Sequence, residues 1–280
     1  MNTQYYRSSH GQRRVPIIIA ILVGLVLIGI LLFSLICRED NIRATSVGAV
    51  VPVAVLKNLT TISPHTWQRL GTDQATPAEK LLHSSTTATV LYIGAEGCPF
   101  CAAERWPLIV ALSRFGHFRG LTLMRSNSED QHPDTPTFSF FHATYQSPYI
   151  HVALMETAGR HLGLNGFYPP LMALSKTQSE TFHLYDRPPY VPNGYAGAIP
   201  FLLIGHRYLW IGSSVNPALL DQHNWVGLSQ AVYSGIGQVG KSILVNANAL
   251  TSAICATDGG HPRSVCRLLN HFPLPTVAVS

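Results

Sequence analysis

The chain has 280 residues, of which 46% are hydrophobic and only 12% are charged, whereas soluble domains carry about 25% charged residues. Its formal net charge is +5, but Lys and Arg do not form the dense clusters expected of a nucleic-acid-binding protein. High hydrophobicity with low charge excludes an intrinsically disordered chain. Five cysteines are too few for a small fold held together by disulfides.

The first predicted element is a membrane anchor over residues 15–37. This run of 23 residues contains no charged side chain, and a helix of that length crosses a hydrocarbon core of about 30 Å. It is longer than the apolar core of a cleaved signal peptide and has no small-residue cleavage site, so we expect it to be retained. Three Arg and no acidic residue precede it, whereas two Arg and two acidic residues follow it closely. The positive-inside rule then predicts that residues 1–14 are cytoplasmic and that the rest of the chain is extracytoplasmic.

After the anchor, residues 38–61 are small, polar and interrupted by proline, which predicts a tether. Short helices are expected at 63–70 and 77–83. Residues 86–95 form an apolar run rich in β-branched residues, typical of a buried strand. Apolar residues follow at helical spacing over 99–115, and 121–124 reads as the next strand. This order predicts a βαβ unit with a right-handed parallel crossover.

The remainder of the outer chain is less regular. Residues 126–197 are rich in polar residues, Gly and Pro, and we interpret them as an insertion with two strands, 137–141 and 149–156, and one helix at 171–176. Two short apolar runs at 199–204 and 208–211 predict a hairpin. From residue 217 to the end the pattern is mostly helical.

One motif carries chemistry: Gly97-Cys98-Pro99-Phe100-Cys101, a C-x-x-C at the predicted junction between strand and helix. Cys98 is expected at the helix N-terminus, where free N–H groups and the helix dipole stabilise a thiolate and lower its pKa. Cys101, one turn later, is then close enough to attack a mixed disulfide formed on Cys98. Pro99 suits the first helical position. The motif therefore predicts a redox-active dithiol.

A second feature supports this interpretation, because Ile199-Pro200 lies at the start of the predicted hairpin. A proline at this place, brought beside the dithiol, can adopt the cis form and leave its neighbours' backbone groups free to pair with a peptide. Thr135-Pro136 is a rival position, but no hairpin follows it closely. The residues expected to contact a substrate are Pro99, Phe100, Ile199 and Pro200.

Residues 94–116 and 198–212 resemble the thioredoxin superfamily, in which the first segment carries the dithiol and the second the cis-proline strand. More narrowly, residues 62–266 are similar to the membrane-anchored, thioredoxin-like family called domain of unknown function 929, through residues 135–156 and the pair Cys255 and Cys266. The resemblance implies an α/β, thioredoxin-like fold over 62–280, with an insertion at about 126–197 and a helical part at about 217–280, preceded by one transmembrane helix. Gly97 replaces the Trp that precedes the first Cys of thioredoxin, and Pro-Phe replaces its Gly-Pro, so the redox potential does not carry over.

Two other interpretations of Cys98 and Cys101 are half of a zinc site and a purely structural disulfide. Zinc usually takes four ligands, often from two C-x-x-C pairs. The remaining pair, Cys255 and Cys266, has ten residues between its members, and the thirteen His show no paired spacing. We therefore expect no metal site. Cys255 and Cys266 are predicted to form a structural disulfide, worth about 3 kcal/mol in the chain-entropy account, or else a second redox pair that takes electrons from Cys101.

Two further features of the sequence have both a structural and a functional interpretation. Residues 235–242 match G-x-x-x-x-G-K-[ST], but a phosphate-binding loop follows a buried strand, and residues 225–234 look helical. We interpret the match as a turn before a helix at 242–256. Glu96 and Glu104 lie close to the dithiol in sequence and can relay a proton to or from Cys101, although Glu104 is as readily a solvent-facing residue.

The sequence thus predicts a single-pass membrane protein whose extracytoplasmic domain exchanges thiols and disulfides with exported proteins. Its partners are membrane lipid, protein thiols or disulfides, and an unidentified redox partner, with no nucleic acid. No organic cofactor is expected, because the dithiol itself is the redox group. The alternative is a non-catalytic, thioredoxin-like binding module at the membrane surface.

Overall fold

The computed structural model describes residues 19, 21–32, 46–81 and 88–278. The chain divides into two compact units, Met1–Ala44 and Thr45–Ser280. In the first unit, residues 21–32 are helical. Within the described ranges, no helix has both the length and the apolar character needed to cross a membrane. Much of the predicted anchor, residues 15–18, 20 and 33–37, lies outside the described residues, so the anchor stays a prediction.

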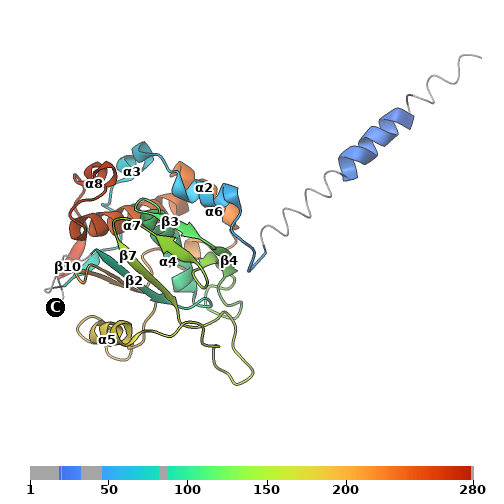
Figure 1. Ribbon diagram of the computed structural model, residues 1–280. Helices are drawn as coiled ribbons and strands as arrows, with labels where there is room; N and C mark the ends of the chain where they lie inside the picture. Colours follow the sequence, from blue (N-terminus) through green and yellow to red (C-terminus); the bar gives the residue numbers. More distant parts are fainter. Residues whose placement is uncertain (1–18, 20, 33–45, 82–87, 279–280) are drawn as a thin grey trace, which may run out of the picture. The chain divides into compact units, whose positions relative to one another are not determined.

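The second unit is built on a mixed sheet of six strands in the order β10-β1-β9-β8-β2-β7 (Figure 1). These strands are β1 (Ala78–Lys80), β2 (Thr89–Gly94), β7 (His151–Glu156), β8 (Phe201–Ile204), β9 (Tyr208–Ile211) and β10 (Thr276–Ala278). Next to the edge strand β7, β2 pairs parallel with β7 and antiparallel with β8. The predicted hairpin is present as the antiparallel pair β8 and β9. The fold is thus mixed α/β with a central mixed sheet.

The predicted βαβ unit is present, but its second strand is not the expected one. After β2 the chain forms α4 (Pro99–Leu112), and the strand that returns parallel to β2 is β7. The predicted partner, now β4 (Thr122–Arg125), pairs with β5 (Pro136–Ser139) in a separate two-stranded sheet, and β3 (His117–Arg119) pairs with β6 (Thr144–Gln146) in another. The interpretation of 126–197 as an insertion is therefore wrong for β7, which belongs to the central sheet.

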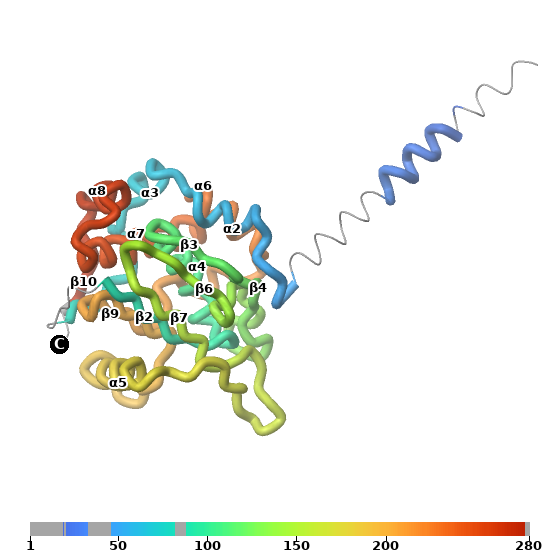
Figure 2. Tube along the Cα trace, in the orientation of Figure 1, coloured from blue at the N-terminus to red at the C-terminus, as the bar shows by residue number. Residues whose placement is uncertain are grey.

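Alternation along β2 places the sheet between two hydrophobic layers. Val90 and Tyr92 face the larger cluster, which contains much of α4 and of α7 (Gly237–Thr257). Ile93 faces a smaller cluster that includes side chains of α5 (Lys176–Tyr185). Figures 1 and 2 show α5 on one side of the sheet, with α4 and α7 on the other.

The predicted tether is shorter than expected, because its described part folds into the second unit. Residues 53–60 form helix α2 (Val53–Thr60), and its Val55 and Leu59 are buried in the larger cluster. Helix α3 (Pro64–Leu70) follows, capped by the Ser63 hydroxyl as the sequence pattern predicts. Hydrophobic residues spaced by four, at 51, 55 and 59, fit one helical face. The proline at residue 52 obscured this pattern in the sequence.

The C-terminal part is mostly helical, as predicted, and ends in strand β10. It contains a short 3-10 helix η1 (Pro217–Leu219), α6 (Trp225–Ser234), α7 and α8 (Arg263–Leu269). Within the glycine-rich match at 235–242, residues 235–236 join α6 to α7 and the rest forms the start of α7, five residues earlier than predicted. A helix rather than a strand thus precedes the match. A Cβ on Gly240 would lie 2.2 Å from the carbonyl oxygen of Ala231. This glycine therefore allows two helices to approach closely, and the segment lacks the context of a phosphate-binding loop.

Candidate active site around Cys98 and Cys101

The C-x-x-C motif lies where β2 gives way to α4. Cys98 is the N-cap residue of α4, and its Sγ accepts a hydrogen bond from the backbone N–H of Cys101 at 3.1 Å. Pro99 occupies the first helical turn, where its missing N–H costs nothing. Cys98 is half-buried and Cys101 fully buried, and neither is in a disulfide. One thiol of the pair is thus reachable from solvent and the other lies behind it.

The surroundings move the two thiol pKa values in opposite directions. A hydrogen bond from the Cys101 side chain lowers the pKa of Cys98, and this effect, with the backbone N–H donors and the charge of Arg105, outweighs burial. For Cys101 burial dominates, and its pKa lies well above the usual value. Free N–H groups at a helix N-terminus favour a thiolate in the same way. Cys98 is therefore the better nucleophile of the pair at neutral pH.

The glycine before the first cysteine is required by close packing. A Cβ on Gly97 would lie 2.6 Å from the carbonyl oxygen of Arg160, so no larger residue fits without a shift of backbone. The carbonyl of Gly97 also accepts a hydrogen bond from the N–H of Asn127 at 2.8 Å. The loops at 127 and 160 therefore form one wall of the site.

The segment before β8 lies against the first cysteine, although 101 residues separate the two in the chain. The Cys98 thiol donates a long hydrogen bond of 3.9 Å to the carbonyl oxygen of Ile199. The Ile199–Pro200 peptide bond is cis, whereas the rival Thr135–Pro136 bond is not among the cis bonds. Asp186, buried at the end of α5, accepts hydrogen bonds from the N–H groups of the two residues before Ile199. The chain thus holds this carbonyl in a fixed place over Cys98.

Two buried charges that the sequence interpretation missed lie next to the dithiol. Arg105, one turn after Cys101 on α4, donates to both carboxylate oxygens of Glu156, at 2.8 and 2.6 Å, and both side chains are fully buried. The same guanidinium donates to the carbonyl of Ala95 at 2.8 Å. A lone Arg four residues after Cys101 in an apolar helix was the available signal, but nothing local identified Glu156 as its partner.

The two acidic residues proposed as proton relays occupy different surroundings. Glu96 is nearly buried, accepts a hydrogen bond from the Ser139 hydroxyl, and has a raised pKa because of its burial. Glu104 is fully buried, so the interpretation as a solvent-facing residue is wrong. One of its oxygens accepts hydrogen bonds from the N–H and the hydroxyl of Ser214, at 2.7 and 2.6 Å. Burial raises the pKa of Glu104 to about 7. Its hydrogen bonds lead to the segment after β9 and not to a thiol.

Phe100 and the loop at 162–168 carry exposed apolar side chains, and Tyr168 connects this loop to the wall of the site. The Phe100 ring is exposed and meets His132 edge to face, with ring centroids 6.2 Å apart. Asn127, whose N–H bonds to Gly97, donates through its side-chain amide to the Tyr168 hydroxyl at 2.8 Å. The exposed apolar residues of that loop are Leu162, Leu164, Phe167 and Tyr168.

The predicted disulfide between Cys255 and Cys266 is present and joins α7 to α8. Thr257, two residues after Cys255, packs against Gly205 in the turn that follows β8. Pro200 precedes β8 and follows Ile199, which lies beside Cys98. The disulfide therefore lies beyond the other end of β8, away from the dithiol. Among the described residues, no group of three or more His, Cys, Asp or Glu is arranged to hold a metal ion.

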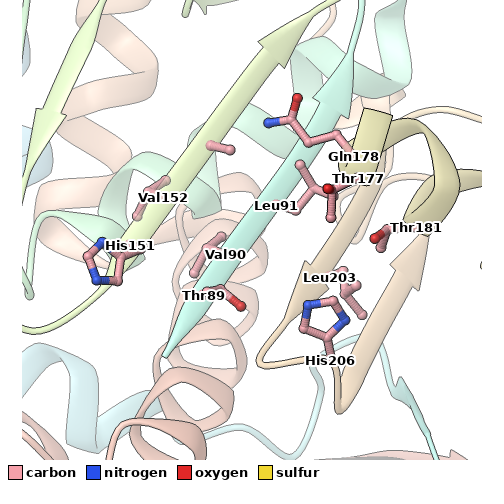
Figure 3. A pocket seen from close by; sticks show the side chains of 11 residues that line it. Thr89, Val90, Leu91, His151, Val152, Thr177, Gln178, Thr181, Leu203 and His206 are labelled. Carbon is pink, nitrogen blue, oxygen red and sulfur yellow. The ribbon is translucent and has the colours of Figure 1, made fainter. Parts of the chain in front are cut away.

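A cavity of about 230 Å³ lies elsewhere, between the sheet and α5 (Figure 3). Its lining includes Thr89 at the start of β2, His151 at the start of β7, and His206 in the turn after β8. Cys98 follows the opposite end of β2. The cavity is therefore separate from the dithiol site.

Comparison with known proteins gives one match. No curated protein and no solved structure matches the chain. The model of a family described as a domain of unknown function, DUF929, matches residues 78–167. This segment contains the dithiol and the buried pair Arg105 and Glu156, whereas Ile199, Pro200 and the disulfide lie outside it. Over the segment that carries Cys98 and Cys101, the chain is thus similar to the DUF929 family.

Proposed function

We propose that the protein is a membrane-anchored thiol–disulfide oxidoreductase with a thioredoxin-like domain, which acts on exported proteins outside the membrane. The observation that carries this proposal is the arrangement of three groups. A half-buried Cys98 with a lowered pKa caps a helix, a buried Cys101 follows one turn later, and the Ile199 carbonyl lies 3.9 Å from the Cys98 sulfur. A reactive thiol, a resolving thiol and an adjacent backbone acceptor are what disulfide exchange with a peptide requires.

The proposed reaction has two steps. The Cys98 thiolate attacks one sulfur of a substrate disulfide, forms a mixed disulfide and releases the other substrate sulfur as a thiolate, which takes a proton. Cys101 then loses its proton and attacks the Cys98 sulfur, which releases the second substrate thiolate. Two electrons pass from the dithiol to the substrate, and a Cys98–Cys101 disulfide remains. The reverse sequence oxidises a substrate dithiol, and an external thiol–disulfide couple restores the starting state.

Substrate recognition in this proposal uses backbone groups and an exposed apolar side chain. Ile199 and Pro200 lie beside Cys98 and present backbone to an extended peptide. Pro99 and the exposed Phe100 directly follow Cys98 in the chain, and Phe100 offers an apolar contact. No organic cofactor takes part, because the dithiol is the redox group.

The thioredoxin-like assignment and the location rest on separate observations. A buried strand, a dithiol at a helix N-terminus, and a hairpin strand antiparallel to the first and preceded by proline support the fold. The charge-free run at 15–37 and its flanking charges support the anchor and the extracytoplasmic side.

The decisive experiment uses the Cys101→Ala variant of the full chain in cells. Without the resolving thiol, mixed disulfides should accumulate on Cys98 and appear as reducible adducts on non-reducing gels. The matched control is Cys98→Ala with Cys101→Ala, which should show none. If the single variant traps no adduct and the wild-type dithiol does not cycle between redox states, the proposal is wrong. An unchanged cellular phenotype of Cys98→Ser would instead favour the binding module.

A further inference from the structure

Helices α2 and α6 carry an apolar surface that the second unit leaves uncovered. Val50 and Val53 are 72% and 83% exposed. We refer to this surface as the α2–α6 face. Its exposed apolar residues are Val47, Val50, Val53, Val226, Tyr233 and Ile236.

The two helices that carry most of these residues pack against each other. Asn58 of α2 donates to the hydroxyl of Ser229 in α6 at 3.1 Å. Beyond the end of α2, Arg69 of α3 reaches the carbonyl of Gly235, which ends α6. These two contacts are in the order expected of helices that run in the same direction. Figure 1 shows α2 and α6 adjacent, at the place where the chain enters the unit.

The helices of this face and their neighbours α3 and α7 carry charges of one sign, and Asp73 and Asp221 flank these segments in the chain. Residues 45–72 and 222–257, which include α2, α3, α6 and α7, contain no Asp or Glu. The exposed cations on these segments are Lys57, Arg69 and Lys241. Exposed apolar side chains with cations and without carboxylates are the composition of surfaces that rest on anionic lipid.

Chain length places the same face near a membrane if residues 15–37 span it. The compact unit begins at Thr45, so residues 38–44 alone connect it to the anchor. Seven residues reach at most about 25 Å when fully extended. The exposed valines at 47, 50 and 53 follow this connection directly.

We propose that the α2–α6 face rests on the anionic phospholipid surface of the membrane that holds the anchor, with its valines inserted among the headgroups. This inference depends on the proposed anchor and location and does not depend on the dithiol chemistry. Docking by this face fixes the orientation of the domain on the membrane, so that Cys98 is presented to substrates in one direction.

The test measures the depth of one side chain in the full chain, reconstituted into nanodiscs that contain anionic and brominated phospholipid. Val53→Trp places a fluorophore on the face, and Leu184→Trp places one at an exposed position of α5, on the other side of the sheet. Because inserted side chains reach about 5–10 Å into the lipid boundary, bromine should quench the added Val53→Trp emission at least about twofold more than that of Leu184→Trp. The wild-type spectrum, from four native Trp, is subtracted from both.

Three outcomes overturn the inference. Equal quenching of the two variants means that the face does not touch lipid. Quenching that is as strong in zwitterionic as in anionic nanodiscs means that the cations do not contribute. Concentration-dependent dimerisation that is lost in Val53→Asp, together with absent quenching, assigns the face to a second copy of the chain. Extraction of the full chain from membranes by alkaline carbonate would instead refute the proposed anchor, so the two failures are distinguishable.

Discussion

Arg105 and Glu156 form a two-point ion pair in which neither side chain reaches solvent, and the arginine lies one turn beyond Cys101 on the same helix. One amino group of the guanidinium has no hydrogen-bond partner among the described residues. The positive charge of Arg105 lowers the pKa of Cys101, against the larger effect of burial. The pair therefore stabilises the fold, and its arginine also favours ionisation of the buried Cys101 thiol.

Replacement of Arg105 by Leu should separate these two roles. Loss of one member of a buried pair leaves an uncompensated charge, so the free energy of unfolding should fall by about 3–5 kcal/mol in urea titration. In the double variant Arg105→Leu with Glu156→Leu, stability should largely return. The pKa of Cys101 should nevertheless be higher than in the wild type, so Cys98-linked mixed disulfides should persist longer. If the double variant resolves these adducts at the wild-type rate, Arg105 has only a structural role.

The order of the two thiol pKa values predicts which cysteine reacts. Cys98 should be alkylated by iodoacetamide with a midpoint below the usual thiol range, while Cys101 stays protected at that pH. Because the largest cause of the lowered pKa of Cys98 is a hydrogen bond from the Cys101 side chain, Cys101→Ala should move the midpoint for Cys98 upward. Mass spectrometry of the labelled peptides measures both midpoints. An identical midpoint in wild type and variant would contradict this account.

The raised pKa of Glu104 predicts that the free energy of unfolding falls as pH rises. Its pKa is about 7 in the folded protein and 4.5 in an ordinary environment, so the folded state binds the proton more tightly than the unfolded state. This stabilising contribution is present below about pH 4.5 and is lost as pH rises through about 7, with a size on the order of 3 kcal/mol. Glu104→Gln should flatten this slope between pH 5 and pH 8 in urea unfolding. The matched control, Glu129→Gln at an exposed position, should leave the slope unchanged.

The disulfide should contribute to stability and not to exchange. Cys255 and Cys266 close a loop with a sequence separation of 11, so Cys255→Ser with Cys266→Ser should cost about 3 kcal/mol by the chain-entropy account. The rate at which the Cys98–Cys101 pair cycles should stay the same, since the two pairs lie at opposite ends of β8. A slowed cycle at a temperature where the variant is folded would favour the relay alternative from the sequence.

Several local features of the site could be read from the sequence. β-branched residues predict the strand before Cys98, and helical spacing predicts the helix after it. The rigidity of proline suits Pro99 to the first helical turn, and all of these signals lie within about twenty residues. The hairpin of β8 and β9 and the pairing of Cys255 with Cys266 also depend on neighbouring residues, and the structure confirms both. By contrast, the predicted partner of β2 is wrong, because strand pairing depends on sheet order and not on proximity in the chain.

The sequence by itself therefore determined the dithiol and its junction between strand and helix, because capping and periodicity act through adjacent residues. Only the tertiary structure decided what surrounds the dithiol. Glu156 is 51 residues from Arg105, and Ile199 is 101 residues from Cys98. Such contacts arise when the central sheet forms and buries its charged groups against one another, and a buried charge is stable only where the fold supplies a partner.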